Sequence, residues 1–231
     1  MTQPWPLLAS GRDADIFDYG PGLVLRRTRT GRSLETEARV MEYARAQGFP
    51  VPAVEELDDD GTSMVMERIE GMDMVTVLAK QPWTVSRQGR LLGELHRRLH
   101  RIAAPQWLSP SPVGDGDALL HLDLHPLNVM LTAEGPVVID WTGACRGPGD
   151  VDVALAWVLL VAGQIPGGRV LSKLLDTGRA LLVRSFLSGF DRRAVASRLH
   201  EVVSYKVTDP HMSTAERDRM WALVRRESSR R

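Results

Sequence analysis

Cysteine is nearly absent from this sequence: Cys145 is the only one in a chain of 231 residues. A single cysteine excludes an internal disulfide framework and is typical of a protein in a reducing cytosol, so we expect a cytoplasmic location. No motif around Cys145 marks it as a nucleophile. A chain of this length can instead bury a substantial apolar core, in one large domain or in two smaller ones that share a cleft.

The sequence also lacks an excess of charge of one sign and any long apolar segment. Lys and Arg together number 29, as do Asp and Glu, so no overall field attracts nucleic acid or an anionic membrane. The longest apolar run, VALAWVLLVA at 153–162, is about half the roughly 20 residues that cross a bilayer, and we expect a buried helix. The stretch MTQPWPLLAS predicts no secretion signal. These absences favour a small-molecule partner, with no nucleic acid and no membrane.

Short strands and one helix are predicted from residue 7 to about residue 69. The run IFDYGPGLVLRR indicates a hairpin around Gly20, Pro21 and Gly22. A helix follows, with Ser33 as the expected N-cap, LETEARVMEYARAQ as its body and Gly48 as a left-handed C-terminal cap. Prolines keep FPVPAVEEL extended, residues 58–61 form a turn, and SMVMERI is a further strand.

Helices dominate after residue 71. Residues 86–102 are amphipathic, and the last helix opens with Ser213 and Glu216 in capping-box positions. Between the helices, residues 119–140 carry two short β runs, NVMLT and VVID, joined by the turn AEGP. The sequence therefore predicts a two-lobed α+β fold: a small β-rich lobe over 1–69 and a larger, mainly helical lobe over 70–231, joined by a hinge at 67–71.

The stretch LHLDLHPLN, residues 120–128, permits two interpretations. His121, Asp123 and His125 alternate, so on an extended strand their side chains would share one face, as in a zinc-dependent hydrolase. The other spacing joins His121, Asp123 and Asn128 in the pattern H-x-D-x-x-x-x-N, the catalytic-loop spacing of protein kinases. Because the zinc interpretation leaves Asn128, Asp140 and the β-rich lobe unexplained, we favour the second.

A further acidic residue, Asp140, ends the apolar run VVID twelve residues after Asn128. Phosphoryl transfer needs one carboxylate that orients and deprotonates the acceptor hydroxyl, and oxygen ligands that hold Mg²⁺ against the nucleotide phosphates. Asp123 suits the first role. Asn128 and Asp140 suit the second, because Mg²⁺ prefers hard oxygen donors and needs only one or two from the protein.

Two upstream elements complete the pattern. The strand run LVLR carries Arg26 at the place of the lysine that pairs with nucleotide phosphates, and Glu37 in the following helix can pair with that cation. Arg27 competes with Arg26, because the sequence leaves the strand register open by one residue, and Glu35 competes with Glu37. The turn SGRDAD, with the single glycine Gly11, is a candidate phosphate loop.

Together these residues resemble the aminoglycoside phosphotransferase and choline kinase-like family, the small-molecule relatives of protein kinases. The matching segments follow the family's order over most of the chain: GRDADIFDYGPGLVLRR, EARVMEYARAQGFPVPAV, MVMERIEG, HLDLHPLNVML, VVIDW and GDVDVALAW. The resemblance implies a kinase-like fold, a Mg²⁺-dependent transfer from ATP or GTP to a small-molecule hydroxyl, and a nucleotide base held by backbone groups near Glu67 and Ile69. It also implies that Asp152 braces the catalytic loop, and we expect His121 to support that loop rather than react.

Three residues depart from the family's pattern: Leu122 where Gly or Asn is usual, Arg26 in place of Lys, and Trp141, expected to pack in the core, in place of Phe. Arg keeps the charge of Lys but not its geometry. Arg26 and Leu122 therefore keep open an alternative, a nucleotide-binding pseudokinase with a regulatory or scaffold role. From Ser213 onward six Arg stand against three acidic residues. This balance disfavours a polycationic aminoglycoside as acceptor and leaves a sugar, an amino alcohol or a nucleoside.

Overall fold

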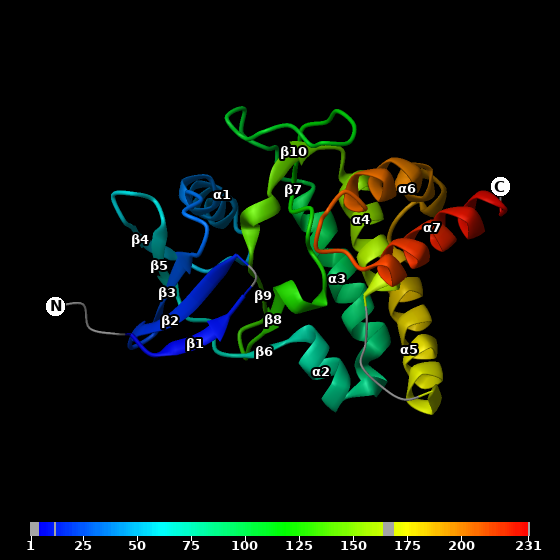
Figure 1. Ribbon diagram of the computed structural model, residues 1–231, viewed down its shortest axis with the longest axis horizontal. Coiled ribbons are helices and arrows are strands. Elements are labelled where there is room, and N and C mark those ends of the chain that lie inside the picture. The colour runs from blue at the N-terminus through cyan, green and yellow to red at the C-terminus, as the bar shows by residue number, and fades with distance from the viewer. Residues whose placement is uncertain (1–4, 12, 164–168, 231) are drawn as a thin grey trace. The chain divides into compact units, whose positions relative to one another are not determined.

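Figure 1 shows the computed structural model of the chain, which describes residues 5–11, 13–163 and 169–230. These residues form two compact units. The first comprises the described residues up to Met72 together with Val129–Ala144, and the second comprises Asp73–Asn128 together with those from Cys145 onward. The division into lobes at 1–69 and 70–231 remains a prediction. In the two observed units, residues 129–144 belong with the N-terminal residues. Arg12 of the SGRDAD turn and the first four residues of the chain lie outside the described residues.

An antiparallel sheet forms much of the first unit. Its order is β1-β2-β3-β5-β4, with β1 (Leu7–Ser10), β2 (Ala14–Gly20), β3 (Leu23–Thr28), β4 (Val54–Leu57) and β5 (Ser63–Glu67). The predicted hairpin is confirmed: β2 and β3 pair across a turn in which Gly20 and Gly22 have positive φ angles, which glycine adopts without strain. The turn at 58–61 is also as predicted, since the Gly61 N–H donates to the Asp58 carbonyl oxygen at 2.9 Å.

Helix α1 (Glu35–Ala46) begins one residue later than predicted. The expected N-cap at Ser33 is wrong, because Leu34 occupies the N-cap position without a side-chain cap. Ser33 Oγ instead accepts from the N–H of Glu35 at 3.2 Å, and the Leu34 N–H donates to the Gly61 carbonyl oxygen at 2.7 Å. This contact to the turn before β5, together with the buried side chain of Leu34, sets where the helix starts. Gly48 follows the helix with φ 76°, as predicted.

The two predicted β runs after Asn128 form a hairpin of the first unit. Its strands are β8 (Val129–Leu131) and β9 (Pro136–Val138), in a sheet ordered β6-β8-β9 with β6 (Met72–Asp73). The Val138 N–H donates to the Pro50 carbonyl oxygen at 2.8 Å. Trp141, in the short helix η3 (Trp141–Gly143), is buried and packs edge-on against Phe49 with centroids 5.7 Å apart. Trp141 is therefore a core residue, as predicted, and it holds the neighbouring Asp140 in the first unit.

Helices make up most of the second unit. They are α2 (Met74–Lys80), α3 (Val85–Leu99), α4 (Gly149–Ala162), α5 (Arg169–Leu187), α6 (Arg192–Lys206) and α7 (Thr214–Ser228), with the short helices η1 (Pro82–Thr84) and η2 (Pro126–Asn128). The capping box at the start of α7 is confirmed, since Ser213 and Glu216 exchange the two expected bonds. Sequence reasoning missed a strand pair, β7 (Ala118–Leu120) with β10 (Cys145–Gly147). Strand β7 ends directly before His121, the first residue of the catalytic-loop motif.

Glycines allow α3 to approach α5 closely. A Cβ at Gly89 would lie 2.6 Å from the Leu182 carbonyl oxygen, and one at Gly93 would lie 2.7 Å from that of Phe186.

The apolar run that begins at Val153 is largely buried in α4, as predicted. None of the described helices combines the length and the apolar character that a membrane span requires. Helices α3 and α4 both contact β7, so the core of the second unit supports this strand and the loop that follows it.

Candidate active site

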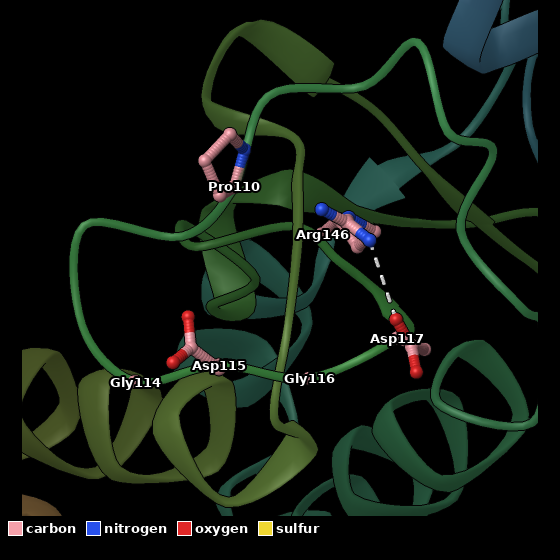
Figure 2. A pocket seen from close by; sticks show the side chains of 6 residues that line it. All are labelled: Pro110, Gly114, Asp115, Gly116, Asp117 and Arg146. Atoms are coloured by element: carbon pink, nitrogen blue, oxygen red, sulfur yellow. Dashed lines mark hydrogen bonds and ion pairs between the residues drawn. The ribbon is translucent and has the colours of Figure 1, made fainter.

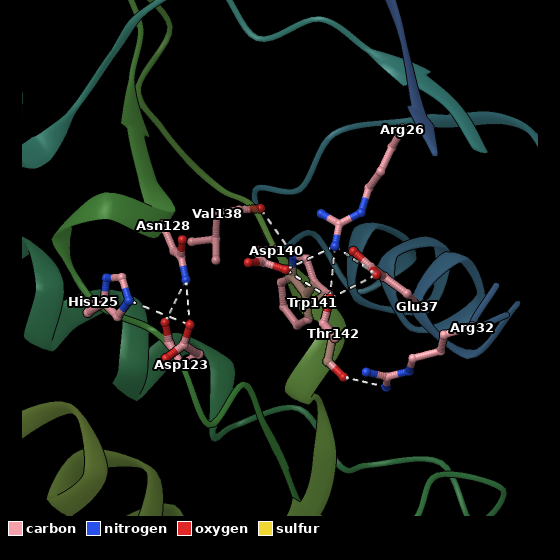
Figure 3. A network of polar contacts seen from close by, with 10 residues as sticks. All are labelled: Arg26, Arg32, Glu37, Asp123, His125, Asn128, Val138, Asp140, Trp141 and Thr142. Atoms are coloured by element: carbon pink, nitrogen blue, oxygen red, sulfur yellow. Dashed lines mark hydrogen bonds and ion pairs between the residues drawn. The ribbon is translucent and has the colours of Figure 1, made fainter. Parts of the chain in front are cut away.

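The loop after β7 brings Asp123 and Asn128 together in the second unit (Figure 3). Asn128 Nδ2 donates to the backbone carbonyl oxygen of Asp123 at 2.8 Å and to its Oδ2 at 3.1 Å. Because the carbonyl oxygen only accepts, the amide nitrogen must face it, which leaves Asn128 Oδ1 for another partner. The Asp123 side chain is 36% exposed, so its carboxylate is open to a small ligand.

Two histidines hold this loop. His121 is fully buried, and its Nδ1 accepts from the backbone N–H of Asp123 at 3.3 Å. His125 accepts from the Leu127 N–H through Nδ1 and places Nε2 3.5 Å from Asp123 Oδ2. The Nδ1 contact favours the tautomer in which Nε2 carries the hydrogen, so His125 faces Asp123 with an N–H group. Both histidines thus orient Asp123.

Charged neighbours keep Asp123 ionised. Burial raises the pKa of the Asp123 carboxyl, but a hydrogen bond from His125 and the positive charge of Lys206 oppose it, and the pKa ends below its ordinary value. An ionised carboxylate is the form that a general base requires. Lys206 is the last residue of α6, so the end of that helix contributes to the electrostatic surroundings of Asp123.

Asp152 anchors the loop from the first turn of α4. Its Oδ1 accepts from the Leu122 N–H at 2.8 Å, and its Oδ2 accepts from the His121 N–H at 3.2 Å and contacts His100 Nε2 at 2.9 Å. Burial of this fully enclosed carboxyl raises its pKa, yet the hydrogen bond from His100 opposes burial and the pKa ends well below its usual range. Asp152 therefore acts as a buried acceptor that fixes the loop backbone.

The backbone at Leu122 decides between the two interpretations of LHLDLHPLN. Leu122 has φ 58°, in the left-handed region that costs a residue with a side chain roughly 1–2 kcal/mol. The positive φ breaks the extended geometry that the zinc interpretation needs. Among the described residues, no three His, Cys, Asp or Glu side chains are arranged to hold a metal ion. The same φ gives a physical reason why Gly or Asn is usual at this position, and the Asp152 bond to the Leu122 N–H holds the strained residue in place.

A buried histidine next to this anchor has no assigned role in the chemistry. His96 is fully enclosed in α3, its Nδ1–H donates to the Leu92 carbonyl oxygen at 2.9 Å, and its Nε2 has no partner among the described residues. Burial lowers the pKa of His96 to about 4. The neutral imidazole is therefore the form that the folded protein retains.

The low pKa of His96 predicts a loss of stability in mild acid. The unfolded chain binds a proton at this side chain near pH 6.5 and the folded chain only near pH 4, so the free energy of unfolding falls as the pH drops through this window. We expect His96 to account for a loss on the order of 3 kcal/mol between these pH values. Urea unfolding at a series of pH values measures it, with His96→Asn as a non-titrating control. The prediction would be contradicted if the free energy of unfolding fell equally steeply with pH in the two proteins between pH 6.5 and 4.

A second polar group lies in the first unit, around Arg26 (Figure 3). Arg26 Nη2 is 2.9 Å from Thr142 Oγ1, 3.2 Å from Asp140 Oδ1 and 3.3 Å from Glu37 Oε2. The Thr142 hydroxyl also lies 3.0 Å from Glu37 Oε2 and 2.9 Å from Asp140 Oδ1. The structure therefore joins Arg26 of β3, Glu37 of α1, and Asp140 and Thr142 at the start of η3. Sequence reasoning missed Thr142, although its place two residues after Asp140 was visible.

The structure also decides which arginine and which glutamate pair. Arg27 projects elsewhere: its guanidinium lies 5.7 Å from the ring centres of Trp5 and Phe17, and its Nε donates to Ser63 Oγ at 3.2 Å. Glu35 is exposed on α1, whereas Glu37 is buried against Arg26. Burial raises the pKa of Glu37, as does the charge of Asp140, while Arg26 and Thr142 oppose them.

The donor atoms of this group fit a hard cation and phosphate oxygens. Asp140 is 42% exposed and its described contacts use Oδ1, which leaves Oδ2 for a metal ion. All described contacts of Arg26 use Nη2, and its Nε is buried without a partner among the described residues, so other guanidinium donors are not engaged. Mg²⁺ characteristically takes one or two protein oxygens and completes its shell with water and phosphate.

The remaining predicted nucleotide contacts lie at the ends of strands. Glu67 ends β5, and its N–H donates to the Ala53 carbonyl oxygen at 2.9 Å. Ile69 follows β5 and is half-buried. Gly11 lies in the turn between β1 and β2, where its N–H donates to the Ala14 carbonyl oxygen at 2.9 Å. The N–H groups of Glu67 and Gly11 are thus already paired, and nucleotide contacts at these positions stay a prediction.

A cavity in the second unit contains none of the predicted site residues (Figure 2). Its volume is about 330 Å³, and it is lined by Pro110, Gly114, Asp115, Gly116, Asp117 and Arg146. Two of these residues form an ion pair, in which Arg146 Nη1 lies 3.3 Å from Asp117 Oδ1. We therefore assign the chemistry to the polar groups above and not to this cavity. Cys145, beside Arg146 in the chain, is no nucleophile, because burial raises the pKa of its thiol to about 12.

Comparison with known sequences also indicates a phosphotransferase. The model of the phosphotransferase enzyme family, APH, matches residues 5–117 and 106–196 of this chain. A probable serine/threonine-protein kinase BUD32 homolog of Archaeoglobus fulgidus is 30% identical over 120 residues, which cover 52% of this chain and 46% of that protein. The chain thus matches under half the length of this curated relative.

Solved structures share the fold over nearly the whole chain. A choline/ethanolamine kinase family protein from Mesorhizobium loti has a TM-score of 0.59 at 19% identity, covering 99% of this chain and 88% of its own. ADP-bound aminoglycoside phosphotransferase APH(2'')-Ib has a TM-score of 0.63 at 12% identity, covering 96% and 92%. Amicoumacin kinase hAmiN, in complex with AMP-PNP, Ca²⁺ and Ami, has a TM-score of 0.56 at 14% identity, covering 99% and 89%. The predicted α+β kinase-like fold is confirmed.

Proposed function

Because the chain belongs to the phosphotransferase enzyme family, we propose that it transfers the γ-phosphate of ATP or GTP to a hydroxyl group of a small molecule. The observation that carries this proposal is the pairing of Asp123 with Asn128, in which an open, ionised carboxylate is oriented by an amide whose oxygen remains available. The nucleotides named with two structural neighbours, ADP and AMP-PNP, support a nucleoside triphosphate as the donor.

In this proposal Asp123 is the catalytic base. Its carboxylate accepts a hydrogen bond from the acceptor hydroxyl and takes the proton as the hydroxyl oxygen bonds to the γ-phosphorus. The bond between that phosphorus and the β–γ bridging oxygen breaks, and the nucleoside diphosphate leaves. His125 keeps Asp123 oriented through its Nε2 group.

The remaining roles fall to the charged groups. Asn128 Oδ1 and Asp140 Oδ2 would hold Mg²⁺, and Arg26, oriented by Glu37, would contact the nucleotide phosphates. Mg²⁺, when bound, neutralises charge that develops on the phosphate oxygens. Gly11 and the backbone near Glu67 and Ile69 would contact the remainder of the nucleotide. His121 and Asp152 support the loop and touch neither substrate.

The charge near Asp123 bears on the acceptor. The Lys206 ammonium acts on the Asp123 carboxylate. This positive charge disfavours a polycation such as an aminoglycoside beside Asp123. We therefore propose a neutral or singly charged acceptor: a sugar, an amino alcohol or a nucleoside.

A substrate panel tests the proposal. The purified protein is mixed with Mg²⁺ and ATP or GTP, and each sugar, amino alcohol, nucleoside or aminoglycoside is scored for release of ADP or GDP. We expect one acceptor class to raise release above the acceptor-free rate and to gain one phosphate group by mass spectrometry. Asp140→Asn should remove Mg²⁺-dependent turnover while leaving the thermal unfolding midpoint close to that of the native protein.

Two results would change the assignment. Turnover that survives the combined Asp123→Ala and Asp140→Ala substitutions would overturn the phosphotransferase mechanism. Tight nucleotide binding without turnover on any acceptor would instead favour the pseudokinase alternative that Arg26 and Leu122 keep open.

A further inference from the structure

The hydroxyl of Thr142 occupies the centre of the Arg26 group. It is the nearest of the three oxygens around Arg26 Nη2, at 2.9 Å, and it also reaches both carboxylates of the group at 3.0 Å or less. A threonine hydroxyl has one hydrogen and two acceptor lone pairs. It can therefore accept from Arg26 at all times but can donate to only one of Glu37 and Asp140 at once.

The hydrogen count on Arg26 leads to the same conclusion. Nη2 carries two hydrogens and faces three oxygens, those of Glu37, Asp140 and Thr142. One of the three contacts must therefore be weak in any single arrangement. Thr142 can supply the missing hydrogen bond, because its hydroxyl hydrogen can rotate toward the carboxylate, Glu37 or Asp140, that receives the weaker bond from Arg26.

The backbone of Thr142 is held as well. Arg32 Nη2 donates to its carbonyl oxygen at 3.2 Å, and Trp141, the preceding residue, donates its indole N–H to the Val138 carbonyl oxygen at 3.0 Å. The Thr142 side chain thus projects from a turn held by hydrogen bonds. Its hydroxyl can rotate between Asp140 and Glu37 without movement of the backbone.

From this geometry we propose that Thr142 is a positioning residue that shares its hydroxyl hydrogen between Asp140 and Glu37. The inference rests on the proposed function. Without nucleotide, the hydroxyl and Arg26 hold the Asp140 carboxylate. When Asp140 serves as a metal ligand, the hydroxyl turns to Glu37, and Arg26 stays fastened by Nη2 to Thr142 and Glu37. Arg26 Nη1, which has no described contact, then remains available to phosphate oxygens.

A matched pair of substitutions tests this role. Thr142→Val keeps the shape of the side chain and removes the hydroxyl, while Thr142→Ser keeps the hydroxyl. We expect Thr142→Val to weaken Mn²⁺ binding, measured by electron paramagnetic resonance in the presence of AMP-PNP, by roughly 10- to 100-fold. Without the hydroxyl both Nη2 hydrogens of Arg26 bond the two carboxylates, so Asp140 must give up a charged hydrogen bond before it binds the metal. Thr142→Ser should restore it to within about 3-fold of the native value, since one bond is retained.

Controls separate positioning from folding. Thr132→Val removes a hydroxyl from the β8–β9 turn of the same unit, where it contacts Glu134 and Gly135, and should leave Mn²⁺ binding unchanged. In steady-state kinetics, Thr142→Val should raise the KM for the metal–nucleotide more than it lowers kcat. Thermal unfolding of each variant checks that the fold is retained.

Three outcomes overturn the proposal. Native-like Mn²⁺ binding by Thr142→Val shows that the hydroxyl is not used. Equal weakening in Thr142→Val and Thr142→Ser assigns the effect to packing. A native protein that binds no Mn²⁺ with AMP-PNP overturns the metal role of the proposed function and this inference with it, which distinguishes that failure from a defect confined to Thr142.

Discussion

Replacing Asp123 with asparagine is expected to lower kcat by about 10²- to 10⁴-fold, the usual contribution of a positioned general base. The substitution conserves shape, and an asparagine oxygen can still accept from Asn128 Nδ2, which lies 3.1 Å from Asp123 Oδ2. What the amide cannot do is take the proton of the acceptor hydroxyl. The KM for nucleotide should change little, because the group acts on the acceptor. Initial rates at saturating nucleotide and acceptor measure the effect.

A matched variant controls for charge in the same unit. Asp115→Asn removes one negative charge from an exposed loop residue that lines the cavity and contacts none of the proposed site residues among the described contacts. Its kcat should equal that of the native protein. A native kcat in Asp123→Asn, or an equal loss in both variants, would remove Asp123 from the role of base.

Replacing Asp152 with asparagine should destabilise the protein by about 3–5 kcal/mol, because hydrogen bonds to a buried charged group, each worth about 1.5–3 kcal/mol, are lost or weakened. The Asp152 carboxylate faces donors on both oxygens: the Leu122 N–H on Oδ1, and the His121 N–H with His100 on Oδ2. An amide presents a donor on one side, so at least one of these buried groups loses its acceptor and bears the desolvation penalty. Urea unfolding at neutral pH measures the change.

The neighbouring Asp150 provides the control. It lies in the same turn of α4, but it is 28% exposed and pairs with Arg198 at 2.9 Å near the surface. Asp150→Asn should cost no more than about 1 kcal/mol, as exposed pairs do. A loss in Asp152→Asn no greater than in Asp150→Asn would show that the buried carboxylate does not support the loop.

The sequence predicted the kinds of elements well where local signals were strong. The glycines of the β2–β3 turn, the Ser213 capping box and the apolar α4 each depend on neighbours within a few residues. Ser33 failed as an N-cap because a distant contact, the Leu34 N–H to the Gly61 carbonyl oxygen, moved the start of α1. The pair of β7 and β10 was missed because strands of three residues carry little pattern.

By itself, the sequence determined the family, and it predicted the residue types of the site, because the spacing from Asp123 to Asn128 and Asp140 is a property of the chain alone. Tertiary structure alone decided which arginine faces which acid. Strand register turns Arg26 toward Glu37 and Arg27 toward Trp5, a choice that a shift of one residue reverses. It also introduced Thr142, since a hydroxyl acquires a role only from the atoms around it, and here those atoms come from β3 and α1.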